Sequence, residues 1–144
     1  MNNHTMLSTL LAAIYHESGR VSVQTGATLA HSVGQAKPFT EWCDLRQEAR
    51  MGREMTAKEL LRRFEFNSLP VLSSLELRTW SIDAMAEAIH ECERLAIDRG
   101  WTVIVLDPPR PWIPFSELPE PAKVGRRNQA QFFLARFDVV AIAG

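Results

Sequence analysis

The stretch WTVIVLDPPRPWIPF, residues 101–115, decides the fold that we expect for this chain. Its first six residues form a run of apolar character, which is typical of a strand covered on both faces. The run ends at a lone carboxylate, Asp107, and six of the eight prolines then lie between positions 108 and 121. The sequence therefore predicts a buried strand over 102–106, followed by a proline-rich crossing.

The segments around this strand alternate between helix and strand patterns. Residues 81–100 place apolar side chains on one face, as in an amphipathic helix that begins after Ser81 and ends at Gly100. A second helix is predicted over 125–136. Strands joined by helices form parallel sheets with right-handed crossovers. We therefore predict an α/β fold with two crossover helices and a small, mainly parallel three-stranded sheet, its strands at about 75–79, 102–106 and 137–143.

The N-terminal half carries helical patterns and short connections. Helices are predicted over 6–18, 27–33 and 40–51, with an extended piece or turn at 20–26 and a linker at 65–74. A further helix is predicted over 55–64, because Thr56 and Glu59 have the spacing of a capping box. We find no internal repeat in the sequence. The expected molecule is a single domain, 1–144, in which a helical subregion (1–66) packs on an α/β subregion (75–144).

Composition places the chain among ordinary globular proteins. Sixteen basic and 17 acidic residues give a net charge of -1, so no overall field attracts nucleic acid or an anionic membrane. The two cysteines fall in helical patterns, which favours free thiols in a reducing compartment. The N-terminal stretch lacks the features of a signal peptide, and its apolar part is too short to span a bilayer. We therefore expect a cytoplasmic protein.

Asp107 has two interpretations. Ligands of parallel sheets bind at the carboxyl ends of the strands, where Asp107 would act as a metal ligand or a general base. An aspartate before proline also begins turns, with its side chain bonded to backbone N–H groups. The predicted last strand runs to the final residue, so no loop follows it to wall a catalytic cleft. We therefore expect no enzymatic activity, with catalysis by Asp107 as an alternative.

The proline-rich crossing is the most suggestive binding surface. Extended proline-aromatic segments are rigid and lose little entropy on docking, and aromatic and arginine side chains dominate interface energies. We therefore predict a small regulatory or adaptor protein that binds another protein or its own copy. The partner-binding surface would comprise Arg110, Trp112, Phe115, Arg126 and Arg127. The same residues allow a contrary interpretation, in which Trp112 and Phe115 fold back over the core.

Two other functional classes are also considered. Glu87 and His90 have the spacing of one element of a di-iron carboxylate site, but no second Glu-x-x-His occurs, so we expect neither metal nor cofactor. Residues 26–51 resemble a helix-turn-helix in the order of helix, glycine turn and helix. That alternative predicts a DNA-binding regulator in which the following residues face DNA: Thr40, Arg46, Gln47 and Arg50.

Overall fold

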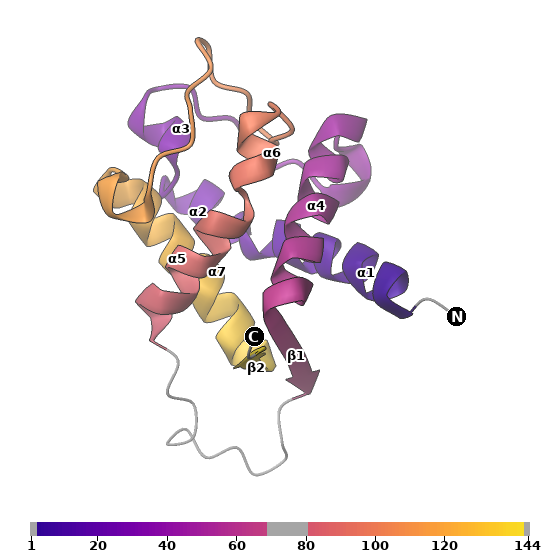
Figure 1. The fold of residues 1–144 in the computed structure, drawn as a ribbon. Helices are drawn as coiled ribbons and strands as arrows, with labels where there is room; N and C mark the ends of the chain where they lie inside the picture. Colours follow the sequence, from indigo (N-terminus) through magenta and orange to yellow (C-terminus); the bar gives the residue numbers. More distant parts are fainter. Residues whose placement is uncertain (1–2, 69–80, 143–144) are drawn as a thin grey trace.

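The computed structural model describes residues 3–68 and 81–142, most of which are helical (Figure 1). The first part contains α1 (Asn3–Ser18), α2 (Arg20–Thr25), α3 (Leu29–Ser32), the 3₁₀ turn η1 (Trp42–Asp44), α4 (Gln47–Arg63) and β1 (Phe64–Ser68). The second part contains α5 (Ile82–Cys92), α6 (Arg94–Asp98), the 3₁₀ turn η3 (Phe115–Glu117), α7 (Glu120–Arg136) and β2 (Phe137–Ala141). In both parts, a 17-residue helix runs directly into a five-residue strand.

The two parts are copies of one structural unit. Each has a long helix, a short helix, a loop, a 3₁₀ turn, a second long helix and a strand, in that order, and the loop of the first half also contains α3. Counterpart residues lie 74 positions apart before the loop, as in His16 and His90, and 73 apart after it, as in Phe64 and Phe137. The expectation of no internal repeat was therefore wrong. We call residues 7–68 the first half and 81–142 the second half.

The halves are related by an approximate two-fold axis. Strands β1 and β2 pair antiparallel, and Phe66 lies opposite its own counterpart, Val139, at the centre of the register. The long helices pack within each half, α1 on α4 and α5 on α7. The short helices pack across the axis, α2 on α7 and α6 on α4. Each half therefore packs its short helix against the other half, and α3 and α6 lie far from the two-stranded ribbon (Figure 1).

Two counterpart glycines permit this close approach between the halves. A Cβ atom on Gly52 would lie 1.8 Å from the carbonyl oxygen of Trp101, and one on Gly125 would lie 2.0 Å from that of Ala27. Both distances are far below van der Waals contact, so α4 and α7 each require glycine where the other half crosses them. Trp101 and Ala27 are themselves counterparts.

The core lies where the long helices and the ribbon meet. Tyr15 and Ile89 are counterparts on α1 and α5, and both are fully buried. Leu60 and Phe133 are counterparts on α4 and α7, and they are fully buried as well. The apolar positions of α5 recur at spacings of three and four, so one helical face is apolar and packs inward.

The predicted α/β fold is wrong. Over the two described ranges the only sheet is the antiparallel pair β1–β2, and 102–106 forms no strand. The predicted strand at 137–143 exists as β2, but its partner is β1, in a region that we expected to be a linker. The predicted strand at 75–79 lies outside the described residues.

The apolar run at 102–106 has another cause than burial in a sheet. It lines a cavity and is partly exposed, and Val105 retains 49% of its accessible surface. Its backbone is held by a side chain, since Arg46 donates hydrogen bonds to the carbonyls of Gly100 and Thr102 at 3.0 and 2.8 Å. A local pattern of apolar residues does not distinguish these two environments.

Several helix boundaries also differ from the prediction. Residues 20–25 form a helix, and α4 continues through Gly52 where we expected one helix to end and another to begin. Thr56 is buried inside α4 and donates to the Gly52 carbonyl, while Glu59 pairs with arginines, so there is no capping box. The helix start at Ser81 is confirmed, because its side chain accepts a hydrogen bond from the N–H of Ala84.

Candidate functional site

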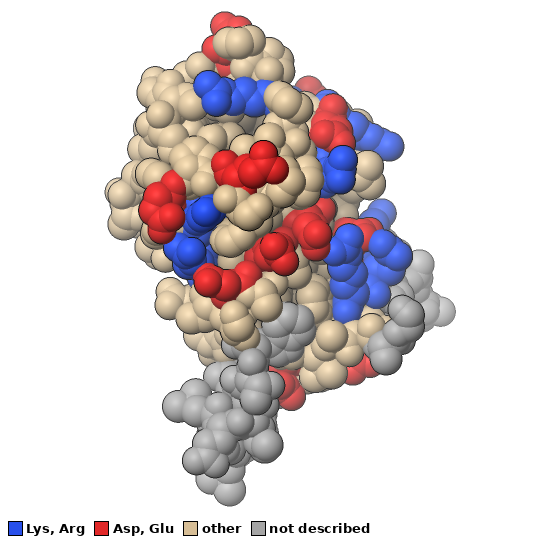
Figure 2. All heavy atoms as spheres, turned by 60° about the vertical axis from the view of Figure 1, so that its left-hand side comes forward, with Lys and Arg blue, Asp and Glu red and all other residues tan. Residues whose placement is uncertain are grey.

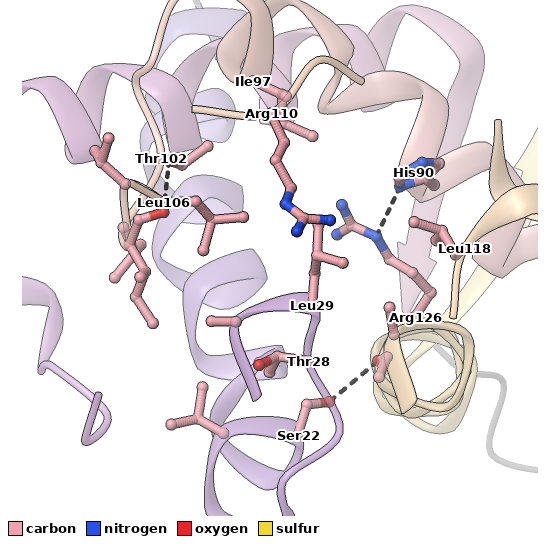
Figure 3. A pocket seen from close by; sticks show the side chains of 18 of the residues that line it. Ser22, Thr28, Leu29, His90, Ile97, Thr102, Leu106, Arg110, Leu118 and Arg126 are labelled. Carbon is pink, nitrogen blue, oxygen red and sulfur yellow. Dashed lines mark hydrogen bonds between the residues drawn. The ribbon is translucent and has the colours of Figure 1, made fainter. Parts of the chain in front are cut away.

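A cavity of about 260 Å³ opens between the two halves (Figure 3). Its walls include residues 27–30 of the first half, residues 102–106 of the second half, and one side of α7. Most of the lining side chains are apolar, among them Leu29, Ile97, Val103, Ile104, Leu106 and Leu118. We call this hollow the central cavity.

A histidine and an arginine from each half meet at the central cavity. His16 donates from Nε2 to the carbonyl of Thr40 at 2.6 Å, and its Nδ1 accepts from Nε of Arg53 at 3.3 Å. In the second half, His90 donates from Nε2 to the carbonyl of Ile113 at 2.7 Å and accepts from Arg126 at 3.1 Å. A carbonyl only accepts and a guanidinium only donates, so each imidazole is neutral and carries its hydrogen on Nε2.

The surroundings of both histidines keep them uncharged. Burial and the neighbouring Arg126 guanidinium together lower the pKa of His90 to about 4. Burial and Arg53 lower the pKa of His16 in the same way. At neutral pH the positive charge of this region therefore resides on the arginines.

Each histidine also belongs to a stack that fixes the loop before the second long helix. The His90 ring stacks on Trp112 at 5.1 Å, and the Arg94 guanidinium lies over the same indole at 4.6 Å. The first half repeats this order, with His16 on Phe39 at 4.8 Å and Arg20 over Phe39 at 4.3 Å. The stacks are therefore structural elements of the repeated unit.

Glu93 joins the two arginines. Its Oε1 accepts from Arg126 at 2.5 Å, while its Oε2 accepts from Arg53 at 2.8 Å and from the Tyr15 hydroxyl at 2.9 Å. Burial opposes ionisation of this carboxyl, but the guanidinium groups of Arg126 and Arg53 hold its pKa at about 2. The three charged side chains, here called the arginine–glutamate cluster, carry two positive charges and one negative charge.

The first half has no equivalent of this carboxylate. The counterpart of Glu93 is Gly19, which also lines the central cavity. The backbone of Gly19 is right-handed, with φ -87°, and a Cβ there would meet no atom closer than 3.5 Å. A side chain is therefore sterically admissible at position 19, and its absence leaves the cluster with an excess positive charge.

The charged side chains that line the central cavity are all arginines. Arg53, Arg110 and Arg126 line it, and the described residues contribute no aspartate or glutamate to its wall. Arg110 is exposed, and no carboxylate within the part of the chain that the structure describes lies at ion-pair distance from it. Figure 3 shows the guanidinium groups of Arg110 and Arg126 pointing into the same hollow.

Asp107 lies in an exposed turn beside the central cavity rather than at the end of a strand. Its backbone N–H donates to Oε1 of Gln35 at 2.8 Å, and its carbonyl accepts from Nε2 of Gln35 at 2.7 Å. Its peptide bond to Pro108 is cis. Asp107 is not among the residues that line the cavity.

The residues of the predicted partner surface have different environments. Trp112 is held in the stack with His90, and its Nε1 donates to the His90 carbonyl at 3.0 Å. Phe115 packs against the core, and Arg126 belongs to the arginine–glutamate cluster. Arg127 pairs on the surface with Asp83 and Glu120. Arg110, Trp112 and Arg126 all line the central cavity, whereas Phe115 and Arg127 are not among its lining residues. The five side chains therefore do not form one patch, and partner binding through them stays a prediction.

The residues proposed to face DNA do not share a helix. Thr40 lies in a loop, and its carbonyl accepts from His16. Arg46 precedes α4 and holds the loop at residue 102, whereas Gln47 and Arg50 are exposed in the first turn of α4. Across the face drawn in Figure 2, basic and acidic side chains are interspersed.

Sequence reasoning missed most of the central site, including His16, Arg53 and Glu93. The available signal was the repeat, because a histidine precedes an arginine by 37 residues in the first half and by 36 in the second. Cys92 is buried and Cys43 is exposed, both as free thiols.

Over 3–68 and 81–142, no group of three or more potential metal ligands lies together. No helix in these same ranges combines the length and the apolar character needed to cross a membrane. No protein-family model, curated protein or solved structure was found to match the chain.

Proposed function

We propose that this protein is a non-enzymatic regulatory protein that binds a small, mainly apolar molecule in the central cavity. The observation that carries the proposal is the cavity itself, which lies between the halves and has apolar walls with a few convergent polar groups. Binding sites for small molecules have this composition. The proposal keeps the non-enzymatic interpretation of the sequence and places the binding event between the halves.

The polar groups at the cavity support binding rather than proton transfer. Both nitrogens of His90 and both of His16 are engaged in hydrogen bonds. Glu93 is ionised and holds three donors. A general acid or base must exchange a proton with its substrate, and these groups are already committed to their neighbours.

The volume of the cavity limits the size of the ligand. A cavity of about 150 Å³ holds benzene, so the central cavity of about 260 Å³ holds roughly ten non-hydrogen atoms. A molecule of this size would contact residues 27–30 and 102–106 together, and would thereby link the two halves. Such contact provides a route from binding to a change in stability or shape.

The test uses neutral apolar probes of about ten non-hydrogen atoms, octanamide and phenylacetamide, with calorimetric titration and thermal unfolding. A probe that binds only the folded protein raises its unfolding temperature in a concentration-dependent way. We expect saturable binding by the wild type and loss of binding by Leu29→Trp, which fills the cavity. Leu95→Trp is the matched control, because Leu95 is 52% exposed and lies outside the lining.

Two results would contradict the proposal. One is the absence of saturable binding to the wild type of both amides and of the carboxylates that correspond to them in size. The other is equal binding by Leu29→Trp and the wild type, which would place the probes elsewhere on the molecule.

A further inference from the structure

The charges around the central cavity do not balance. Arg53, Arg110 and Arg126 face it, and Glu93 supplies a single carboxylate behind Arg53 and Arg126. Both histidines are held neutral by their hydrogen bonds. The groups at the cavity therefore carry three positive charges and one negative charge.

Arg110 is exposed, but the rest of this excess lies where water is largely excluded. The side chains of Arg53, Arg126 and Glu93 retain only 14%, 13% and 12% of their accessible surface. Burying a charge is unfavourable unless it is paired and hydrogen-bonded. An anion that enters the cavity would gain two effects at once, a guanidinium partner and a low-dielectric setting that strengthens the pair.

The approximate two-fold symmetry of the halves indicates where the site has room for a second carboxylate. Glu93 occupies one of two counterpart positions, and Gly19 leaves the other without a side chain. The amide nitrogen of Gln129 lies 3.7 Å from the position that a Cβ on Gly19 would take. Its Oε1 already accepts from Arg126 at 2.9 Å, so the group that Gln129 presents toward Gly19 is a donor.

We infer that the ligand of the central cavity is a small amphipathic carboxylate, held by Arg110 and by the donors around Gly19, with its apolar part along the walls. This inference rests on the proposed binding function and adds the charge of the ligand. The carboxylate would compensate for the missing counterpart of Glu93. The apolar remainder would fill the hollow beside Leu29 and Leu106, which Figure 3 shows on the walls.

The experiment compares each carboxylate with a neutral molecule of the same size. Octanoate is titrated against octanamide, and phenylacetate against phenylacetamide, by calorimetry at low and high salt. We expect at least one carboxylate to bind ten or more times more tightly than its amide, with the advantage reduced at high salt. Octylamine should not bind.

The outcomes separate the inference from the function on which it rests. Equal binding of carboxylate and amide overturns the inference and leaves the cavity as a binding site. Failure of all four molecules to bind overturns both. If inorganic phosphate displaced a bound carboxylate as effectively as another carboxylate does, the site would bind small anions in general. That result would overturn the assignment of an amphipathic ligand.

Two pairs of variants locate the carboxylate. Arg110→Gln should weaken carboxylate binding about tenfold more than it weakens amide binding. Arg50→Gln, which alters an exposed arginine outside the lining, is its control. Gly19→Glu supplies the missing carboxylate within the protein and should weaken carboxylate binding far more than Gly19→Gln, which adds the same volume without charge. Equal effects of these two substitutions would contradict the placement near Gly19.

Discussion

Glu93 and Gly19 occupy counterpart positions in the two halves, yet only Glu93 contributes a carboxylate to the arginines at the central cavity. This difference makes the centre of a nearly two-fold molecule electrostatically one-sided. The hydrogen bonds of the two histidines, His16 and His90, are by contrast duplicated.

Removing the Glu93 charge should strongly destabilise the fold. Glu93→Gln leaves Arg53 and Arg126 buried against one another, and breaking a buried pair in this way costs about 3–5 kcal/mol. Urea denaturation measures the loss. Glu91→Gln is the control, because the exposed pair of Glu91 with Arg63 contributes at most about 1 kcal/mol. Equal losses in both variants would contradict the role of the cluster.

Acidification should destabilise the protein in two successive pH ranges. The folded pKa of His90 is about 4, below its ordinary 6.5, so the unfolded chain binds this proton more readily. The stability from His90 is complete above about pH 6.5 and is lost as the pH falls to 4, by about 3 kcal/mol. Glu93, with a folded pKa of about 2, contributes stability above about pH 4.5 that is lost below it.

The pH dependence is measured by urea denaturation between pH 7.5 and 3. His90→Gln removes the titrating group and should flatten the profile between pH 6.5 and 4, although its stability at pH 7 is lower. A variant profile parallel to that of the wild type would assign the acid sensitivity to other groups.

Gly52 and Gly125, where the two halves cross, should not tolerate a side chain as small as a methyl group. Gly52→Ala and Gly125→Ala each place a Cβ about 2 Å from a backbone carbonyl of the other half. Because backbone atoms cannot move aside as a side chain can, each substitution should cost about 3 kcal/mol. Gly19→Ala should change the free energy of unfolding by less than about 1 kcal/mol, since its Cβ meets only ordinary contacts. Thermal unfolding compares all three.

The aromatic stacks should contribute to stability in both halves. Trp112→Ala removes an indole packed between His90 and Arg94, and Phe39→Ala removes the counterpart ring. Each side chain is half-buried, so we expect a loss of about 2 kcal/mol from either substitution. Val140→Ala, on the exposed side of β2, should lie within about 0.5 kcal/mol of the wild type. A Trp112→Ala protein of unchanged stability would instead support an interface role for this residue.

The helices were the predictable part of this fold, because their signals are local. The cap at Ser81 and the apolar spacing of residues 82–92 sufficed to identify α5. The strand partners were not predictable, since 68 residues separate the end of β1 from the start of β2 and the two strands meet only through tertiary pairing. An apolar run such as 102–106 reports only that water is partly excluded, so a cavity wall and a buried strand give the same pattern.

The repeat was concealed because burial constrains volume and polarity more than identity. Tyr15 corresponds to Ile89, and Leu60 to Phe133, although all four side chains are fully buried. Gly52 illustrates the same limit at the backbone. Its sequence context indicated a helix end, whereas its actual role is to admit the Trp101 carbonyl from the other half. The central site depends on such contacts between halves, and it could be identified only with the halves assembled.

The exchange of short helices across the axis has a consequence for how this molecule could arise. Such reciprocal packing is the arrangement of a homodimer, and joining two protomers in one polypeptide preserves it. A symmetric homodimer must carry glutamate at both equivalent sites or at neither. Tandem fusion releases each copy from that constraint, and a centre with a single carboxylate then becomes accessible to evolution.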